Sequence, residues 1–110
     1  FLNVHEGPQA ISKFNNVKIE EGMILSNEPG YYETNKFGIR IENLVYTKKI
    51  KNKLKFVNLT LAPIEKDLIN FKLLKENEKK YLNEYHKKVY LILGSYLNKN
   101  ERIWLRSFFN

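Results

Sequence analysis

The fold of this chain is decided by the stretch Ser26-Asn27-Glu28-Pro29-Gly30-Tyr31-Tyr32, which is followed by Gly38-Ile39-Arg40-Ile41-Glu42-Asn43. The two segments predict two strands with an excursion between them. The first strand ends at Pro29-Gly30, because proline cannot donate a ladder hydrogen bond and glycine tolerates a turn. The second run alternates, so that two sets of side chains face opposite ways: Ile39, Ile41, Asn43 and Val45 against Arg40, Glu42, Leu44 and Tyr46.

Pairing of these two strands would bring the carboxylates of Glu28 and Glu42 close together. One interpretation is a solvated strand face with a surface ion pair between Arg40 and Glu42, which contributes little to stability. The other is a site for a divalent cation such as manganese, because carboxylate oxygens suit hard metal ions and two close carboxylates repel each other without one. The pattern alone leaves both interpretations open.

Composition places the chain among ordinary globular proteins. Its 110 residues suffice for one small domain with a modest core, and 43% of them are hydrophobic and 14% aromatic. No stretch is long and apolar enough to span a membrane, and the N-terminus lacks the features of a signal peptide, so no membrane partner is expected. The chain does not begin with methionine, so we expect it to start within a longer protein or to have been processed. The absence of cysteine excludes disulfides and thiolate metal sites, and it fits a reducing compartment.

The formal net charge is +7, a feature shared with many nucleic-acid-binding proteins. The lysines are scattered, however, from Lys13 to Lys99, and many stand beside Asn or Glu. The densest group comprises Lys48, Lys49, Lys51, Lys53 and Lys55. We expect this group to lie in a solvated hairpin loop, and we predict no nucleic-acid partner.

The period of the apolar residues changes from two to 3.6 near residue 74, which predicts strands before that point and helices after it. Further strands are expected at residues 2–4, 17–19 and 56–64. The main helix is expected over about 75–97, with an apolar stripe formed by Tyr81, Leu82, Tyr85, Val89, Ile92, Leu93 and Tyr96. A short terminal helix is expected over 101–109, and His86 is expected on a largely exposed helix without a functional role. The predicted class is α+β, with an antiparallel sheet over 1–64 followed by helices.

Three segments resemble the C-terminal part of a Xaa-Pro aminopeptidase (aminopeptidase P) of the eukaryotic cytosolic type: Phe1-Leu2-Asn3-Val4-His5-Glu6-Gly7-Pro8, Glu28-Pro29-Gly30-Tyr31-Tyr32 and Gly38-Ile39-Arg40-Ile41-Glu42-Asn43. These enzymes belong to the pita-bread metallopeptidases. The spacing of 14 residues between Glu28 and Glu42 (42 − 28) fits the same family, as do Leu59–Ile64, Tyr81–His86 and Trp104. The resemblance implies the C-terminal half of a pita-bread catalytic domain over 1–64 and a C-terminal helical extension over 65–110.

The resemblance also implies a dinuclear metal site, usually of two manganese ions, held by two Asp, one His and two Glu. Glu28 and Glu42 match the two glutamates. Glu42 would bridge the metals, and Glu28 would bind one of them and help to deprotonate the attacking water. His5 matches a histidine that contacts the substrate without binding metal. Arg40 would orient the carboxylate ligands, and Tyr32 would line the site.

The implied reaction removes the N-terminal residue from peptides with proline in second position by attack of a metal-held hydroxide, in the cytoplasm. The family's other three metal ligands lie upstream of Phe1, and Asp67 fits neither aspartate position. The chain alone is therefore expected to be inactive and to need the remainder of its polypeptide. Aromatic residues over 75–109, together with the dimers of the family, imply a homodimer. The alternative is a pita-bread module without catalysis that binds proteins or nucleic acid.

Overall fold

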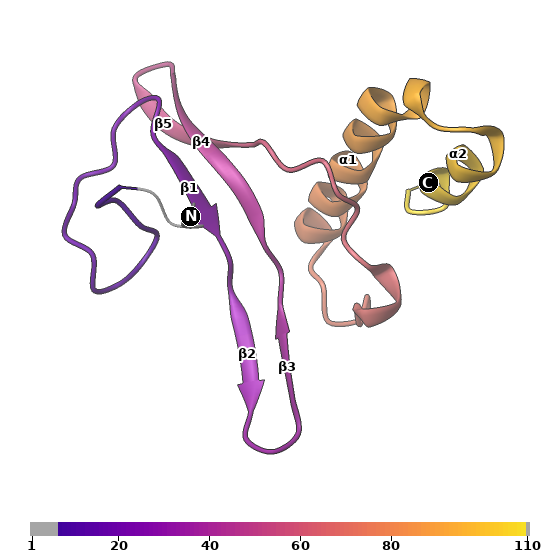
Figure 1. Cartoon of the computed structure of the whole chain (residues 1–110), viewed down its shortest axis with the longest axis horizontal. Coiled ribbons are helices and arrows are strands. Elements are labelled where there is room, and N and C mark those ends of the chain that lie inside the picture. Colours follow the sequence, from indigo (N-terminus) through magenta and orange to yellow (C-terminus); the bar gives the residue numbers. More distant parts are fainter. Residues whose placement is uncertain (1–6, 110) are drawn as a thin grey trace. The chain divides into compact units, whose positions relative to one another are not determined.

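The computed structural model describes residues 7–109 (Figure 1). The chain divides into two compact units, with the division between Thr60 and Leu61. Within the described residues, the first unit contains the strands and the second contains the helices. The predicted α+β class, with antiparallel strands followed by helices, is confirmed. None of the helices in this part of the chain has the length and apolar character needed to cross a bilayer.

Among its described residues, the first unit has five strands: β1 (Ile24–Asn27), β2 (Gly30–Glu33), β3 (Phe37–Arg40), β4 (Asn43–Ile50) and β5 (Lys53–Asn58). β1, β4 and β5 form a three-stranded antiparallel sheet with β4 in the middle, and β2 pairs with β3 in a two-stranded ribbon. In Figure 1, β2 follows on from β1 and β3 leads into β4. Two successive ladders therefore make up one long antiparallel pairing.

The small core of the first unit lies on one face of β1 and β4. Leu25 and Val45 are directly opposite each other, and both are buried. Thr47, two residues further along β4, points to the same face and is also buried. Its hydroxyl donates to the carbonyl of Glu20, which ties the irregular segment before β1 to the sheet.

The strand predicted at residues 17–19 is wrong, because this segment is irregular. The N–H of Val17 donates to the side-chain oxygen of Asn15 at 2.8 Å, so it is satisfied locally. Side-chain bonds of this kind compete with the pairing of a strand in a ladder.

The hairpin between β4 and β5 is tighter than the sequence predicts. Its turn is Lys51-Asn52, and both residues have positive φ (48° and 60°), as is typical of a two-residue turn that matches the twist of its strands. The loop expected for the densest lysines is therefore wrong, because Lys48 and Lys55 lie on strands, directly opposite each other. β5 accordingly covers Lys53–Asn58, whereas a strand was expected over 56–64.

Up to residue 109, the second unit contains four helical segments: η1 (Lys66–Leu68), α1 (Glu76–Leu93), η2 (Gly94–Tyr96) and α2 (Lys99–Arg106). Its core consists of Tyr85 and Val89 of α1 and Leu105 of α2. The helix expected over 75–97 corresponds to α1 followed by the 3₁₀ turn η2. The apolar stripe is thus buried at its centre and exposed at its ends, because α2 covers only part of α1.

The helix α2 begins two residues before its predicted start at Glu101, because Asn98 caps it. The side-chain oxygen of Asn98 accepts hydrogen bonds from the N–H groups of Asn100 and Glu101, at 2.9 and 3.0 Å. The carboxylate of Glu101 in turn accepts from the N–H of Asn98 at 2.8 Å. This reciprocal capping box satisfies backbone donors that a helix start leaves unpaired.

Candidate functional site

A single register runs through both ladders of the long pairing. The numbers of two facing residues add up to 70 in each ladder, as in the pairs Asn27–Asn43 and Gly30–Arg40. A break in register would turn the side chains beyond it to the other side of the strands. Because the register is continuous, even-numbered residues of both ladders share one side.

Glu28 and Glu42 occupy the junction between the two ladders. The continuous register places them opposite each other, and the N–H of Ile41 donates to the carbonyl of Pro29 across the junction at 3.1 Å. Residues that face each other in an antiparallel pair point to the same side. The two carboxylates therefore belong to one side of the pairing.

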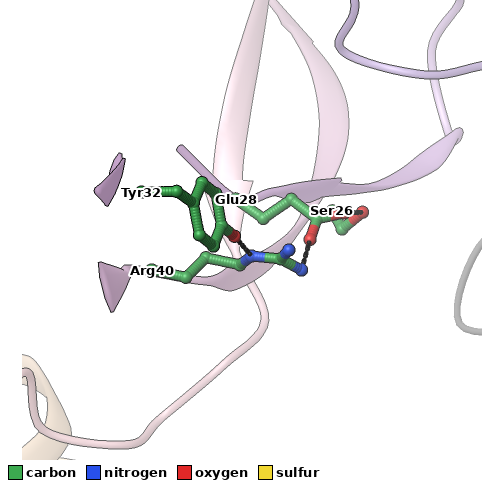
Figure 2. Close-up of polar contacts among 4 residues, drawn as sticks. All are labelled: Ser26, Glu28, Tyr32 and Arg40. Carbon is green, nitrogen blue, oxygen red and sulfur yellow. Dashed lines mark hydrogen bonds and ion pairs between the residues drawn. The ribbon is translucent and has the colours of Figure 1, made fainter. Parts of the chain in front are cut away.

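Both carboxylate oxygens of Glu28 accept hydrogen bonds from residues on this side (Figure 2). The hydroxyl of Ser26 donates to Oε1 at 3.1 Å, and the guanidinium of Arg40 donates to Oε2 at 2.7 Å. The side chain of Glu28 is 21% exposed and that of Arg40 is 50% exposed. These two bonds orient the carboxylate and use part of its capacity of about four acceptor positions.

Arg40 is itself held in place by Tyr32. Its Nε donates to the hydroxyl of Tyr32 at 2.8 Å, and its guanidinium carbon lies 5.8 Å from the centre of the ring. The hydrogen bond to Tyr32, and then the charges of Tyr32, Glu28 and Glu42, raise the pKa of Arg40. Arg40 therefore stays charged and bridges Tyr32 and Glu28 through two different nitrogen atoms.

The surface ion pair expected between Arg40 and Glu42 is wrong, because Arg40 pairs with Glu28 instead. The hydroxyl of Tyr32 holds the guanidinium so that it reaches across to the neighbouring strand (Figure 2). Glu42 is exposed just before β4, and its charge contributes to the raised pKa of Arg40. Glu42 thus lies within electrostatic reach of the guanidinium without pairing with it.

The donor set fits part of a site for a hard divalent cation. Glu28 and Glu42 offer carboxylate oxygens, which such cations prefer, from two strands on one side of the pairing. Across residues 7–109, no group of three or more His, Asp or Glu side chains gathers that could hold a metal. The described residues therefore fit a partial ligand set, which groups from elsewhere would have to complete.

Two further residues named from the sequence complete the comparison. His5 lies outside the described residues, and Asp67 lies in η1 of the second unit. Conversely, the sequence analysis missed Ser26, which holds Glu28. Ser26 precedes Glu28 by two residues, and this strand spacing on one side is the signal that could have identified it.

His86 is fully buried, which contradicts the exposed position expected from the sequence. Its Nε2 accepts a hydrogen bond from the N–H of Ile64 at 3.0 Å, and its ring packs edge-on against Phe108 at 5.2 Å between centroids. Burial lowers the pKa of His86; the backbone of Phe108 opposes this shift, and the charge of Lys66 adds to it. Ile64, in the segment that precedes α1, and Phe108, which follows α2, both contact the ring, and helical periodicity does not reveal these tertiary contacts.

Both halves of the chain match protein-family models. A model described as the C-terminal region of peptidase M24 matches residues 52–107, about half of the chain, and a model of metallopeptidase family M24 matches residues 2–49. The resemblance on which the sequence analysis relies is thereby confirmed.

Individual relatives agree with these matches. A probable Xaa-Pro aminopeptidase P of Coprinopsis cinerea is 44% identical over 96% of this chain and 19% of its own length, and an uncharacterised peptidase of Schizosaccharomyces pombe is 43% identical over the same shares. An X-prolyl aminopeptidase of Caenorhabditis elegans, described as a cytosolic enzyme with a di-nuclear active site, is similar in structure. It is 37% identical with a TM-score of 0.82, over 99% of this chain and 19% of that chain, in agreement with the expected part of a pita-bread fold. The chain spans about a fifth of the length of the relatives that it matches.

Proposed function

This chain belongs to metallopeptidase family M24, and we propose that it is the C-terminal part of a Xaa-Pro aminopeptidase. In this proposal, residues 1–64 complete the catalytic domain and residues 65–110 form a helical extension. The full-length protein removes the first residue from peptides that carry proline in second position. The chain alone is inactive, because three of five metal ligands come from the rest of the polypeptide.

The observation that carries the proposal is the position of Glu28 opposite Glu42 at the junction of two ladders with one register. We propose Glu42 as the ligand shared by two metal ions and Glu28 as a ligand of one of them. Carboxylates on neighbouring strands are held at a distance set by the ladder, which suits ligands that must share a pair of ions. We propose manganese as the metal, since carboxylate oxygens suit Mn²⁺, as they also suit Mg²⁺ and Ca²⁺.

The bound metal pair would supply Lewis acidity and lower the pKa of water at the site. The chain's own residues contribute orientation and proton transfer. Arg40 and Ser26 each hold one oxygen of Glu28, so the carboxylate keeps a single orientation while it accepts the proton of the attacking water. Tyr32 keeps Arg40 in place, and His5 is proposed to contact the substrate.

The proposal also covers the location, oligomeric state and substrates of the full-length protein. We propose a cytoplasmic enzyme, in line with the description of the C. elegans relative as cytosolic. We also propose a homodimer that involves the helical extension. Tyr96 and Trp104 are among its exposed aromatic side chains, at 85% and 55% of their surface. Its substrates are peptides with penultimate proline.

The experiment that tests the proposal compares Glu42→Gln with Glu33→Gln in the full-length protein. Glu33 serves as a matched control, since it lies on the same ribbon and forms an exposed ion pair with Lys36 at 2.6 Å. Glu42→Gln should reduce both bound Mn²⁺ and cleavage of an Arg-Pro-Pro peptide by more than the roughly 10- to 100-fold loss typical of partners around a ligand. Glu33→Gln should keep both, as measured by metal analysis and peptide hydrolysis.

Two outcomes would contradict the proposal. Wild-type full-length protein that binds no divalent metal and cleaves no Xaa-Pro peptide would favour the alternative of a non-catalytic binding module. Full activity in Glu42→Gln would remove Glu42 from the ligand set, and with it the argument from the register.

A further inference from the structure

Gly30 begins strand β2 and Gly38 lies within β3, and glycine is unfavourable in a strand because it has no side chain to pack and loses much backbone freedom on folding. Neither residue has a positive φ, whereas Gly7 and Gly22 do. The backbone conformation therefore does not require glycine at these two positions. The reason for the missing side chains must lie in their neighbours.

The ring of Tyr32 covers both glycines. A Cβ atom at Gly38 would lie 2.6 Å from Cδ1 and 2.9 Å from Cε1 of Tyr32. A Cβ atom at Gly30 would lie 2.8 Å from Cε2 and 2.8 Å from the hydroxyl oxygen of the same ring. These separations are shorter than van der Waals contact, so a methyl group at either position would displace the ring from its place.

Register explains why these residues meet. On one side of the ribbon, Tyr32 lies opposite Gly38 and Arg40 lies opposite Gly30. Each large side chain therefore has one glycine across from it and the other glycine next to it on the same side of its own strand. The ring extends diagonally across the space that the glycines leave open, and its hydroxyl reaches Nε of Arg40 at 2.8 Å. Diagonal neighbours in a ladder are within reach of aromatic and long side chains.

We propose that Gly30 and Gly38 are positioning residues that form a glycine shelf under the ring of Tyr32. The shelf fixes the ring of Tyr32. The hydroxyl of Tyr32 then holds Arg40, and Arg40 in turn orients the carboxylate of Glu28, as Figure 2 shows for these three side chains. The link from the shelf to a metal rests on the proposed function, in which Glu28 is a metal ligand. The shelf itself rests on the geometry of the ribbon.

The test is a double-mutant cycle of Gly38→Ala and Tyr32→Ala in the full-length protein, with Mn²⁺ affinity measured by competition with a chromogenic chelator. Gly38→Ala alone should weaken Mn²⁺ binding by about tenfold or more, as loss of a group that orients a ligand does. In the Tyr32→Ala background, Gly38→Ala should have no further effect, because the ring that it displaces is gone. The matched control is Gly94→Ala, where a Cβ atom would meet its nearest neighbour at 3.8 Å; it should leave Mn²⁺ affinity unchanged.

A second readout needs no metal. In the metal-free protein, Gly38→Ala should lower the melting temperature when Tyr32 is present. In the Tyr32→Ala background the same substitution should raise the melting temperature or leave it unchanged, since alanine at a compatible position restricts the unfolded chain. This reversal of sign separates a steric shelf from a general need for glycine in the strand.

Each readout can fail separately. Equal changes in melting temperature in both backgrounds would overturn the glycine shelf. A shelf confirmed by melting, combined with unchanged Mn²⁺ affinity in Gly38→Ala, would overturn its role in orienting Glu28. Wild-type protein that binds no divalent metal and cleaves no Xaa-Pro peptide would overturn the proposed function, whereas the melting cycle would still decide whether the shelf exists.

Discussion

The long strand pairing and the helical unit hold an ionisable side chain in opposite ways. On the pairing, Glu28 remains partly exposed and each of its oxygens accepts a hydrogen bond, one of them from the cation Arg40. In the helical unit, His86 is fully buried, and its Nε2 accepts a hydrogen bond from the backbone N–H of Ile64. The first arrangement leaves the carboxylate accessible to a ligand, whereas the second favours a neutral imidazole that water does not reach.

The residues around Glu28 thus serve the proposed function, whereas the residues around His86 serve the stability of the helical unit. Arg40, which pairs with Glu28, is half exposed, so this ion pair contributes little to folding but defines the direction of a carboxylate. The buried side chains around His86 stabilise the helical unit through apolar contact, and no described feature there resembles a ligand set. Substitutions in the two regions should therefore change different quantities.

The largest expected effect on stability is that of Leu105→Ala in α2. Leu105 is 2% exposed and packs with Tyr85 and Val89, so its truncation should destabilise the helical unit by about 2–5 kcal/mol through lost burial and a cavity. Hydrogen–deuterium exchange of α1 amides in the full-length protein measures this loss. Ile103 lies on the same helix and is 62% exposed, so the control Ile103→Ala should change stability by no more than about 0.5 kcal/mol. Weaker Mn²⁺ binding in folded Leu105→Ala protein would contradict the expectation that substitutions in the helical unit change stability and leave metal binding unchanged.

A smaller effect is expected from acidification, through His86. Burial lowers the pKa of His86 below its ordinary value of 6.5, so the unfolded chain binds a proton more readily than the folded one. The stabilising contribution is complete above pH 6.5 and is lost as the pH falls below that value towards the lower pKa of the folded state. Protonation also removes the acceptor that Nε2 offers to Ile64, and Lys66 opposes the added charge.

The measurement compares protection factors of α1 amides at pH 8 and pH 5, after correction for intrinsic exchange, in wild type and in His86→Gln. Glutamine keeps a hydrogen-bond acceptor and does not titrate, so the variant should lose less protection between the two pH values than wild type. An equal loss in both proteins would show that His86 does not cause the pH dependence.

The smallest expected effect on stability is that of Arg40→Gln on the strand pairing. The ion pair with Glu28 is half exposed on the arginine side, so the melting temperature of the metal-free protein should hardly change. Mn²⁺ affinity should nevertheless fall, by roughly 10- to 100-fold, because Glu28 loses the group that orients it. Lys36→Gln removes the other ion pair of the ribbon and should change neither quantity. A large fall in melting temperature for Arg40→Gln would contradict the contrast between the regions.

Several features of the site could be predicted from the sequence because they follow from strand geometry alone. Alternation from Ile39 to Tyr46 placed Arg40 and Glu42 on one side, and the turn at Pro29-Gly30 suggested the partner strand that carries Glu28. The choice that Arg40 makes between the two carboxylates was not predictable. It depends on the hydroxyl of Tyr32. The position of that hydroxyl depends on the register between β2 and β3 and on the absence of a Cβ atom at Gly30 and Gly38.

What the sequence by itself determined is therefore what the backbone period dictates: strands up to about residue 64, helices from about residue 75, and two glutamates brought to one side of a pairing. Only the tertiary structure decided which side chains from different elements come into contact. It set the turn at Lys51-Asn52, the pairing of Arg40 with Glu28 and the burial of His86 beneath the segment before α1. The physical reason is that periodicity reports the direction of a side chain, whereas contact depends on which distant segment packs against it.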